Sequence, residues 1–243
     1  MNSAAVPAEQ ASVVRLLIHV EGETEEAFVN EVLAPHLYGR GYATVSARLL
    51  GNARLRDRRG GIRAWDSVRQ DIIHHLCEDP GCIATTMVDY YALPRVGTKA
   101  WPGRDAPSGF SFEQKAQAVE DAIFADVCGR MGTGFATSRF VPFVVMHEFE
   151  GLLFSDCDRF AVGIGRPELA PAFRGVRQGF GSPEEINDSP ETAPSKRVEG
   201  LFPGYQKPLF GALAALEIGL EAMRGECGHF NRWLERLEAI AIS

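Results

Sequence analysis

The chain has 243 residues, enough for one large domain or two small ones, and its 45% hydrophobic and 23% charged residues are ordinary for a globular protein. Its net charge of −7 does not favour a strong stand-alone nucleic-acid binder, although local basic patches matter more than the total. Five cysteines at irregular spacing fit neither a disulfide framework nor a zinc site, and without a signal peptide or an apolar run of ~20 residues we expect a cytoplasmic protein that does not enter a membrane.

The first predicted element is a buried strand over residues 13–20, an apolar run rich in β-branched side chains. It stops at Glu21, and a helical pattern of apolar residues follows at once. Four carboxylates crowd this strand-to-helix corner: Glu21, Glu23, Glu25 and Glu26. Carboxylates held so close must protonate or share a cation. The alternative is an ordinary helix start, with acids in its first turn and Thr24 as its cap.

Strands and helices are predicted to alternate through the next part of the chain. Apolar runs of β-type residues predict strands over residues 43–50, 82–88 and 139–146. Helical periodicity predicts helices over residues 65–76 and 112–127. This alternation is typical of a parallel sheet with helices on its faces.

The remaining segments are predicted to be loops, except near the C-terminus. Residues 90–112 are rich in Gly, Pro and aromatic side chains and form a longer loop than usual, which is often functional. We expect residues 160–182 to be irregular and residues 183–197 to form a polar turn region. A final helical part is expected over residues 209–240.

Residues 52–63 form a basic segment around a Gly-Gly pair. By composition it is a solvated loop. In a nuclease it would serve as a clamp on the nucleic-acid backbone, giving salt-sensitive affinity without sequence preference. The residues assigned to this contact are Arg54, Arg56, Arg58 and Arg59.

Acidic residues follow three of the predicted strands: Glu21 after the first, Asp89 after the third, and Glu148 with Glu150 after the last. The carboxyl ends of parallel strands lie at one edge of a sheet, so these residues should converge. Hard cations such as Mg²⁺ prefer oxygen ligands, and a carboxylate cluster holding one or two of them is the usual equipment for phosphodiester hydrolysis. The alternative is that polar residues stand at the strand ends by chance.

The chain resembles the family known as domain of unknown function 4276 through four motifs in order: VEGETEEAFVNEVLAPHL, MVDYYALP, HEFEGLLFSD and PEEINDSPETAPSKR. The resemblance covers residues 16–237. That family is similar to Toprim domains, the metal-dependent catalytic fold of topoisomerases, primases and OLD-type nucleases. The resemblance implies a Toprim-like (Rossmann-like) fold, Mg²⁺-dependent phosphoryl transfer, and frequent pairing with an ATPase in phage-defence or mobile loci.

The resemblance also assigns roles to individual residues. Glu21 matches the Toprim glutamate after the first strand, and Glu25 matches the second acid of the OLD-type pattern. Asp89 matches the first aspartate of the Toprim Asp-x-Asp motif, but Tyr91 stands in place of the second. A tyrosine is no charged Mg²⁺ ligand at neutral pH, so this departure puts the metal stoichiometry or the activity in question.

Other residues could complete the site. Glu148 and Glu150 could supply the oxygens that the motif lacks, and Asp156 is a weaker candidate. His147 could be a ligand or a water-orienting base, or it could simply be packed in the core.

Three basic residues are candidates for phosphate contacts: Lys196, Arg197 and Lys207. The first two lie in residues 186–197, which allow two interpretations. One is a proline-rich turn followed by a helix capped by Ser195. The other places Asp188 and Glu191 at the metal edge, with the two basic residues on a phosphate.

We therefore expect one Toprim-like α/β domain over residues 13–243, with disordered residues 1–12 and a helical part over residues 183–243. The expected function is metal-dependent cleavage of DNA or RNA with an ATPase partner, in phage defence or a mobile element. The expected ligands of Mg²⁺ or Mn²⁺ are Glu21, Glu25, Asp89, Glu148 and Glu150. The expected catalytic residues are Glu21, Glu25, Asp89, Glu148 and Lys196.

Two other functions stay open at this point. The chain could be a non-catalytic regulatory subunit of an ATPase complex, in which the degenerate motif is only a remnant of the fold. It could also be a metal-dependent phosphohydrolase acting on small nucleotides. Homo-oligomerisation stays open as well.

Overall fold

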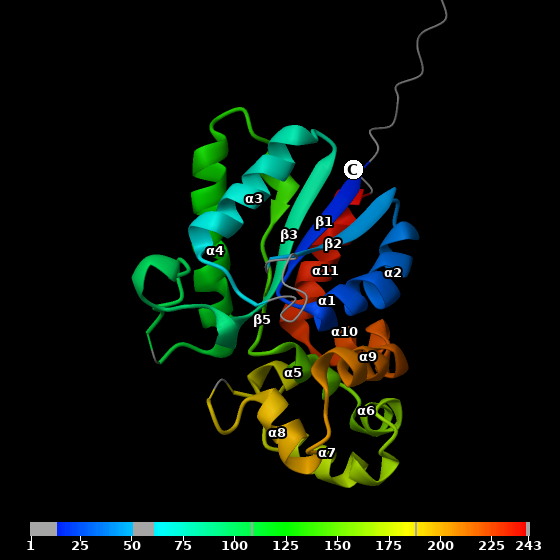
Figure 1. Ribbon diagram of the computed structural model, residues 1–243. Coiled ribbons are helices and arrows are strands. Elements are labelled where there is room, and N and C mark those ends of the chain that lie inside the picture. Colours follow the sequence, from blue (N-terminus) through cyan, green and yellow to red (C-terminus); the bar gives the residue numbers. More distant parts are fainter. Residues whose placement is uncertain (1–13, 51–60, 108, 188, 242–243) are drawn as a thin grey trace, which may run out of the picture.

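A sheet of parallel strands forms the centre of the protein, which a computed structural model describes over residues 14–50, 61–107, 109–187 and 189–241 (Figure 1). The strands are β1 (Arg15–Val20), β2 (Thr44–Leu49), β3 (Cys82–Asp89), β4 (Phe140–Val141) and β5 (Val144–Val145). Their order is β2-β1-β3-β4, with β5 paired to the far end of β3, and every pairing is parallel. The predicted parallel sheet is confirmed.

The strand predicted over residues 139–146 is divided into β4 and β5 by Pro142 and Phe143. Proline has no N–H to donate to a neighbouring strand. The side chain of Thr86 on β3 bridges the gap, because its hydroxyl donates to the Phe143 carbonyl at 2.8 Å and accepts from the Phe143 N–H at 3.0 Å. A side chain thus takes over the missing strand-to-strand bonds, and the chain continues into β5.

Helices cover both faces of the sheet (Figure 1). They are α1 (Glu23–Phe28), α2 (Ala34–Tyr38), α3 (Trp65–Glu78), α4 (Phe112–Met131) and α11 (Gly228–Ala241). Ala84 and Val88 of β3 belong to the core under α3 and α4, whereas Ile83 and Met87 of the same strand belong to the core under α1, α2 and α11. Alternate residues of one strand therefore serve two cores, as expected for a strand buried on both faces.

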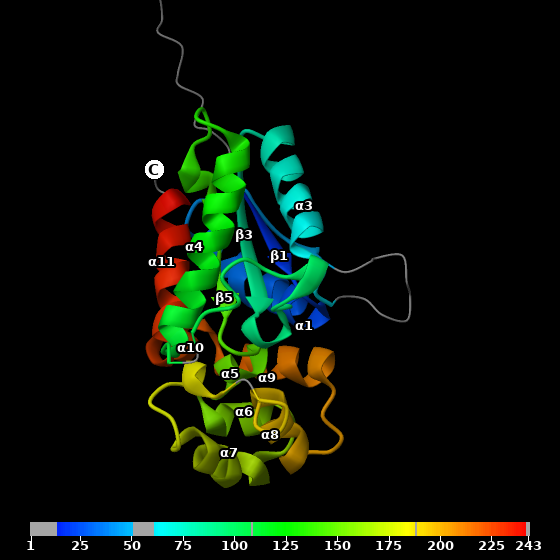
Figure 2. The same ribbon diagram turned by 90° about the vertical axis from the view of Figure 1, so that its left-hand side faces the viewer.

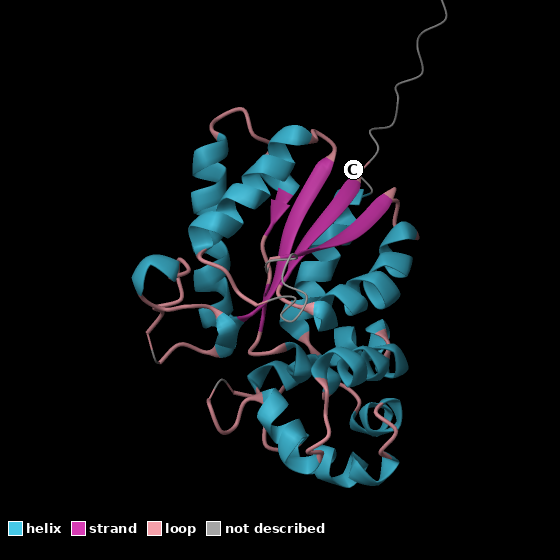
Figure 3. Cartoon of the chain, in the orientation of Figure 1, coloured by secondary structure: helices cyan, strands magenta, loops and turns pink. Residues whose placement is uncertain are grey.

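A further group of helices lies across the carboxyl end of the strands (Figure 2). These are α5 (Phe149–Leu153), α6 (Cys157–Gly163), α7 (Ala170–Arg177), α8 (Pro194–Leu201), α9 (Ala212–Ile218) and α10 (Leu220–Glu226). Beyond β5, every regular element that the structure describes is a helix (Figure 3). The helical part thus begins at Phe149 and not near residue 183. None of the described helices is both long and apolar enough to cross a membrane.

The expectation of irregular structure over residues 160–182 is wrong, because α6 and α7 lie there. The rings of Phe160 and Phe173 stack with 4.4 Å between their centroids, and both meet the ring of Phe154 edge-on. Burial of these rings outweighs the weak helix propensity of a glycine-rich segment, since propensity is only a weak prior.

Short helical turns connect the longer elements. They are η1 (Val29–Leu33), η2 (Tyr90–Ala92), η3 (Gly97–Lys99), η4 (Thr137–Arg139), η5 (Pro167–Leu169), η6 (Pro183–Glu185) and η7 (Lys207–Gly211). Both η1 and η7 are π-helical, and η1 joins α1 to α2 without a break. The cap residue of α1 is Gly22 and not Thr24, which lies buried inside the helix.

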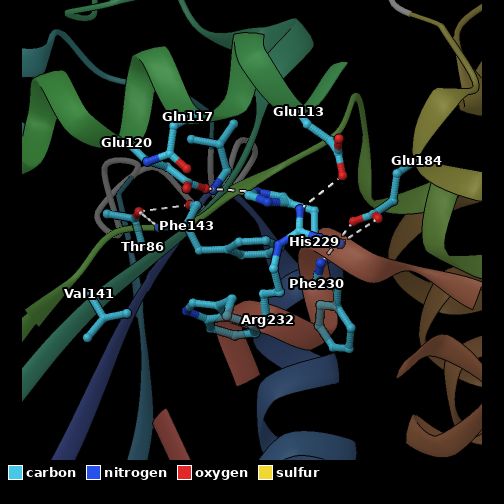
Figure 4. A network of polar contacts seen from close by, with 12 residues as sticks. Thr86, Glu113, Gln117, Glu120, Val141, Phe143, Glu184, His229, Phe230 and Arg232 are labelled. Atoms are coloured by element: carbon cyan, nitrogen blue, oxygen red, sulfur yellow. Dashed lines mark hydrogen bonds and ion pairs between the residues drawn. The ribbon is translucent and has the colours of Figure 1, made fainter. Parts of the chain in front are cut away.

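A buried polar network fixes α11 against α4 and the sheet (Figure 4). The side chain of Glu120 on α4 accepts from the Val144 N–H at 2.9 Å and is hydrogen-bonded to His229 Nε2 at 2.9 Å. The two carboxylate oxygens of Glu184 accept from the N–H groups of His229 and Phe230, so η6 caps the first turn of α11. Because η6 also packs against α5, this network helps to set where α5 begins.

Candidate functional site

The predicted acidic residues meet at the carboxyl end of the sheet. Val20 at the end of β1 is level with Met87, so Asp89 lies two residues further along β3, level with Val145. Glu21 follows β1 directly, and Glu148 is the cap residue of α5. The structure therefore brings together five carboxylates from three parts of the chain: Glu21, Glu25, Asp89, Glu148 and Glu150.

Three of these carboxylates are held by backbone N–H groups at helix starts. Glu25 Oε2 accepts from the Gly22 N–H at 3.0 Å, where α1 begins. Asp89 Oδ1 accepts from the Phe149 N–H at 2.9 Å, where α5 begins. Glu148 Oε2 accepts from the Ser195 N–H at 2.8 Å, where α8 begins. Each bond fixes one oxygen of a carboxylate at the partly positive end of a helix.

One basic side chain lies among the carboxylates. The ammonium of Lys207, at the start of η7, donates to Glu150 Oε2 at 3.1 Å and lies 3.6 Å from Glu148 Oε1. Burial alone would lower the pKa of Lys207, but the surrounding carboxylates, Glu150 foremost, raise it above its ordinary range. Lys207 therefore stays charged and offsets part of the negative charge.

A single ammonium is not enough to keep all of the carboxylates ionised at neutral pH. Burial, aided by neighbouring carboxylates, raises the pKa of Glu21 and of Glu25 to about 7. Burial likewise raises the pKa of Asp89 well above its usual range and raises that of Glu150. The site favours bound protons or an added cation over five bare negative charges.

Unused polar atoms also gather here. Among the described residues, four buried side-chain N or O atoms have no hydrogen-bond partner, and three of them belong to residues of this region: Glu21 Oε2, Glu150 Oε1 and the Tyr205 hydroxyl. The fourth is Arg69 Nε. Buried polar atoms normally find a partner, so this concentration indicates a place for a ligand.

By chemistry, the oxygens present fit a hard divalent cation, which prefers carboxylate ligands. The unused atoms Glu21 Oε2 and Glu150 Oε1 are free to serve as such ligands. No three His, Cys, Asp or Glu side chains of the described chain already surround a metal position. An ion held by Glu148 and Glu150 would take the place that the Lys207 ammonium occupies beside them.

Three other positions discussed in the sequence analysis lie outside the group of carboxylates: Asp156, His147 and Tyr91. Asp156 is the cap residue of α6 and accepts from the N–H groups of Asp158 and Arg159, so its side chain is already in use. His147 is buried, with Nδ1 hydrogen-bonded to the Ile186 carbonyl at 2.7 Å. Tyr91 is 37% exposed, so the position at which the resemblance expects a second acid carries a surface tyrosine.

The basic side chains of residues 186–197 have protein partners in this structure. Lys196 Nζ pairs with Glu199 at 2.7 Å, and Arg197 donates to the Thr192 carbonyl at 2.8 Å. Glu191 is exposed.

Of the two interpretations of this segment, the turn followed by a helix is present, but Ser195 is not its cap: α8 begins after Ala193, and the Ser195 N–H instead holds Glu148. The remaining candidates of these groups lie outside the described residues: Arg54, Arg56, Arg58, Arg59 and Asp188.

Two contributions to the site were not predicted. One is the Ser195 N–H, because a backbone donor leaves no signature in a sequence. The other is Tyr205, which is 8% exposed. Its only signal was its place after Pro203-Gly204 and two residues before Lys207.

Comparisons with known proteins give one match. A family model described as "Domain of unknown function (DUF4276)" matches residues 20–238, a span that contains every carboxylate of the site and Lys207. The searches of curated proteins and of solved structures found no match.

Proposed function

We infer a function from the premise that this chain belongs to the DUF4276 family of domains of unknown function. We propose a metal-dependent hydrolase that cleaves phosphodiester bonds of nucleic acid on a Toprim-like fold. The observation that carries the proposal is the group of five carboxylates with unused buried oxygens at the carboxyl end of a parallel sheet. That is where ligands bind in open α/β sheets, and carboxylates with a divalent ion are suited to this chemistry.

The proposal assigns separate roles to the residues of the site. Glu21, Asp89 and Glu150 would hold Mg²⁺ or Mn²⁺, with Glu148 beside them. Such an ion, when bound, stabilises charge on the attacking and leaving oxygens. Glu25, whose pKa is raised to about 7, can take up and release a proton near neutral pH.

Lys207 would change its partner when substrate binds. Its ammonium now lies between two carboxylates, 3.1 Å from Glu150 and 3.6 Å from Glu148. When a cation takes over those carboxylates, the ammonium is free to donate a charge-assisted hydrogen bond to a phosphate oxygen. Lys196 stands at the edge of the site, within electrostatic range of Glu148 and Lys207, and is a second donor for the same substrate.

The resemblance noted in the sequence adds a setting to this activity. We propose an ATPase partner that delivers or regulates the nuclease, in phage defence or a mobile element. A partner of this kind would supply the attraction to nucleic acid that a chain of net charge −7 lacks on its own. Both the substrate and such a partner would place the protein in the cytoplasm.

The experiment is a cleavage assay on plasmid DNA, single-stranded DNA and RNA with Mg²⁺ or Mn²⁺, run with and without a candidate ATPase partner. Asp89→Asn and Glu21→Gln should each lower the cleavage rate by at least about 100-fold, because each removes a charged ligand. The matched control is Glu113→Gln, an exposed glutamate paired with Arg232, which should stay within twofold of the wild type.

Equal rates for the wild type and the two site variants would contradict the proposal. So would a wild type that neither cleaves a polymer nor binds the metal in calorimetry. That second result would leave the regulatory-subunit interpretation. Turnover of free nucleotides alone would assign the site to small phosphorylated molecules.

A further inference from the structure

Tyr205 carries a buried hydroxyl that the roles proposed above do not use. The residue is 8% exposed, and its hydroxyl has no hydrogen-bond partner. A buried hydroxyl without a partner costs stability, so a native protein seldom keeps one without a reason. Replacing it by a phenylalanine would remove the cost and keep the ring.

The surroundings of this hydroxyl place it at the carboxylate site. A Cβ atom added to Gly211 would lie 3.4 Å from the Tyr205 hydroxyl, 2.7 Å from Thr24 Cγ2 and 3.9 Å from Phe149 Cε1. The hydroxyl therefore lies where η7 meets α1 and α5, the elements that carry Lys207, Glu25 and Glu150.

The ring is held in place by packing. It lies nearly parallel to the ring of Phe210, at 23° and with 6.0 Å between the centroids. The Tyr205 N–H donates to the Phe202 carbonyl at 2.9 Å, which fixes the backbone. Burial and the nearby charge of Glu150 raise the pKa of Tyr205, so the hydroxyl keeps its proton and is available as a donor.

Tyr205 and Lys207 form a pair of donors on one short segment. Lys207 lies two residues further on and points its ammonium at Glu150. The Tyr205 hydroxyl and Glu150 Oε1 are both without a hydrogen-bond partner. Neither Tyr205 nor Lys207 therefore donates to this oxygen of Glu150. A phosphate group presents several oxygens at once and could accept from a neutral and a charged donor together.

We propose that Tyr205 binds the substrate, its hydroxyl donating a hydrogen bond to a non-bridging phosphate oxygen beside the ammonium of Lys207. This inference rests on the proposed function, because it takes the phosphate to be the group cleaved at the carboxylate site. It adds a hydroxyl donor to a site otherwise formed by carboxyl groups and an ammonium.

The test compares Tyr205→Phe with Tyr42→Phe. Tyr42 is the matched control, since its buried hydroxyl donates to the Leu237 carbonyl at 2.8 Å and lies in the core. Tyr205→Phe should have an unchanged or higher Tm, because it removes an unsatisfied hydroxyl. Tyr42→Phe should have a lower Tm, because it leaves a carbonyl without its donor.

Two readouts then separate function from structure. With Mn²⁺ present, calorimetry should show that Tyr205→Phe binds inorganic phosphate at least about fivefold more weakly than the wild type, with unchanged affinity for Mn²⁺. Its cleavage rate should fall about 10- to 100-fold. Tyr42→Phe should match the wild type in both measurements.

The outcomes distinguish this inference from the proposed function. Equal phosphate affinity in Tyr205→Phe and the wild type overturns the role of Tyr205, whether or not the protein cleaves nucleic acid. Weaker Mn²⁺ binding with unchanged phosphate binding also overturns it, since the hydroxyl would then act on the carboxylates. A wild type without cleavage but with phosphate binding that depends on Tyr205 overturns only the nuclease assignment.

Discussion

Lys207 decides the charge balance of the candidate site. Its ammonium lies against Glu148 and Glu150, and no other Lys or Arg of the described chain forms an ion pair with the five carboxylates. Removal of Lys207 would leave buried negative charges without a counter-ion. Breaking a buried ion pair in this way destabilises a protein, because an uncompensated charge stays buried. In the proposed function a bound cation would offset the same negative charges, so the ion and this ammonium would compete for the same oxygens.

Most of the acidic residues could be predicted from the sequence, because four of them stand at the ends of three predicted strands and parallel strands end at one edge. Their hydrogen bonds could not. The bond from the Phe149 N–H to Asp89 and the bond from the Ser195 N–H to Glu148 both depend on how elements far apart in the chain are packed. The burial of Tyr205 depends on the same packing, so the sequence did not indicate that its hydroxyl belongs to the site.

Stability in acid should depend on His19, which lies on β1 two residues before Glu21 and is fully buried. Burial lowers the pKa of His19 to about 3 in the folded protein, from 6.5 in an unfolded chain. Between these values the unfolded chain binds a proton that the folded protein does not. The free energy of unfolding therefore falls as the pH drops from 6.5 towards 3, by about 1.4 kcal/mol per pH unit.

The measurement is urea unfolding of the wild type and His19→Gln between pH 7 and 4. The carboxylates are common to both proteins, so their titration cancels in the difference. Below pH 6 we expect the difference in free energy of unfolding, wild type minus variant, to fall by about 1.4 kcal/mol for each pH unit. Parallel curves would show that His19 titrates alike in the folded and unfolded states.

Among the elements of the fold, three short helices position the carboxylates of the site. Glu25, Asp89 and Glu148 each hold the first turn of a different helix, α1, α5 and α8. None of these helices is long enough to be stable alone, so their tertiary contacts keep them formed. The positions of the carboxylates thus depend on how closely the helices across the end of the sheet pack together.

Gly211 allows one of these close contacts. An added Cβ there would lie 2.7 Å from Thr24 Cγ2, closer than side-chain atoms approach one another. Gly211→Ala should therefore push η7 away from α1, cost about 1–3 kcal/mol of stability and lower the cleavage rate. Chemical denaturation and the cleavage assay measure the two effects.

The matched control for this substitution is Gly225→Ala on α10, where an added Cβ meets nothing within 4 Å. Alanine there should leave stability equal or raise it by about 0.4–1 kcal/mol, with unchanged cleavage. If Gly211→Ala behaves like Gly225→Ala in both assays, the close contact between η7 and α1 does not set the geometry of the site.

Long, periodic elements could be predicted from the sequence, and short ones could not. The helices predicted over residues 65–76 and 112–127 are confirmed as α3 and α4, each extending a few residues further. The helices α6 and α7 were missed, because burial of Phe160 and Phe173 is a property of the folded chain. The break at Pro142 was visible as a proline, but its repair by Thr86 was not.

In the whole molecule, a parallel sheet presents its carboxyl end to a cover of helices (Figures 1 and 2). The residues of the candidate site come from both parts. The DUF4276 match spans both parts, from residue 20 to residue 238. The family therefore includes the cover together with the sheet. Lys207, Tyr205 and the Ser195 N–H all come from this cover, so the sheet alone would carry an incomplete site.

We propose that the carboxylates at the end of the sheet bind a divalent cation. The most direct measurement is an anomalous difference map from crystals of the full chain grown with Mn²⁺. We predict a peak about 2.0–2.3 Å from carboxylate oxygens of Asp89, Glu21 and Glu150, with Lys207 displaced from Glu150. A map without a peak at these residues, with Lys207 still between Glu148 and Glu150, would contradict the claim.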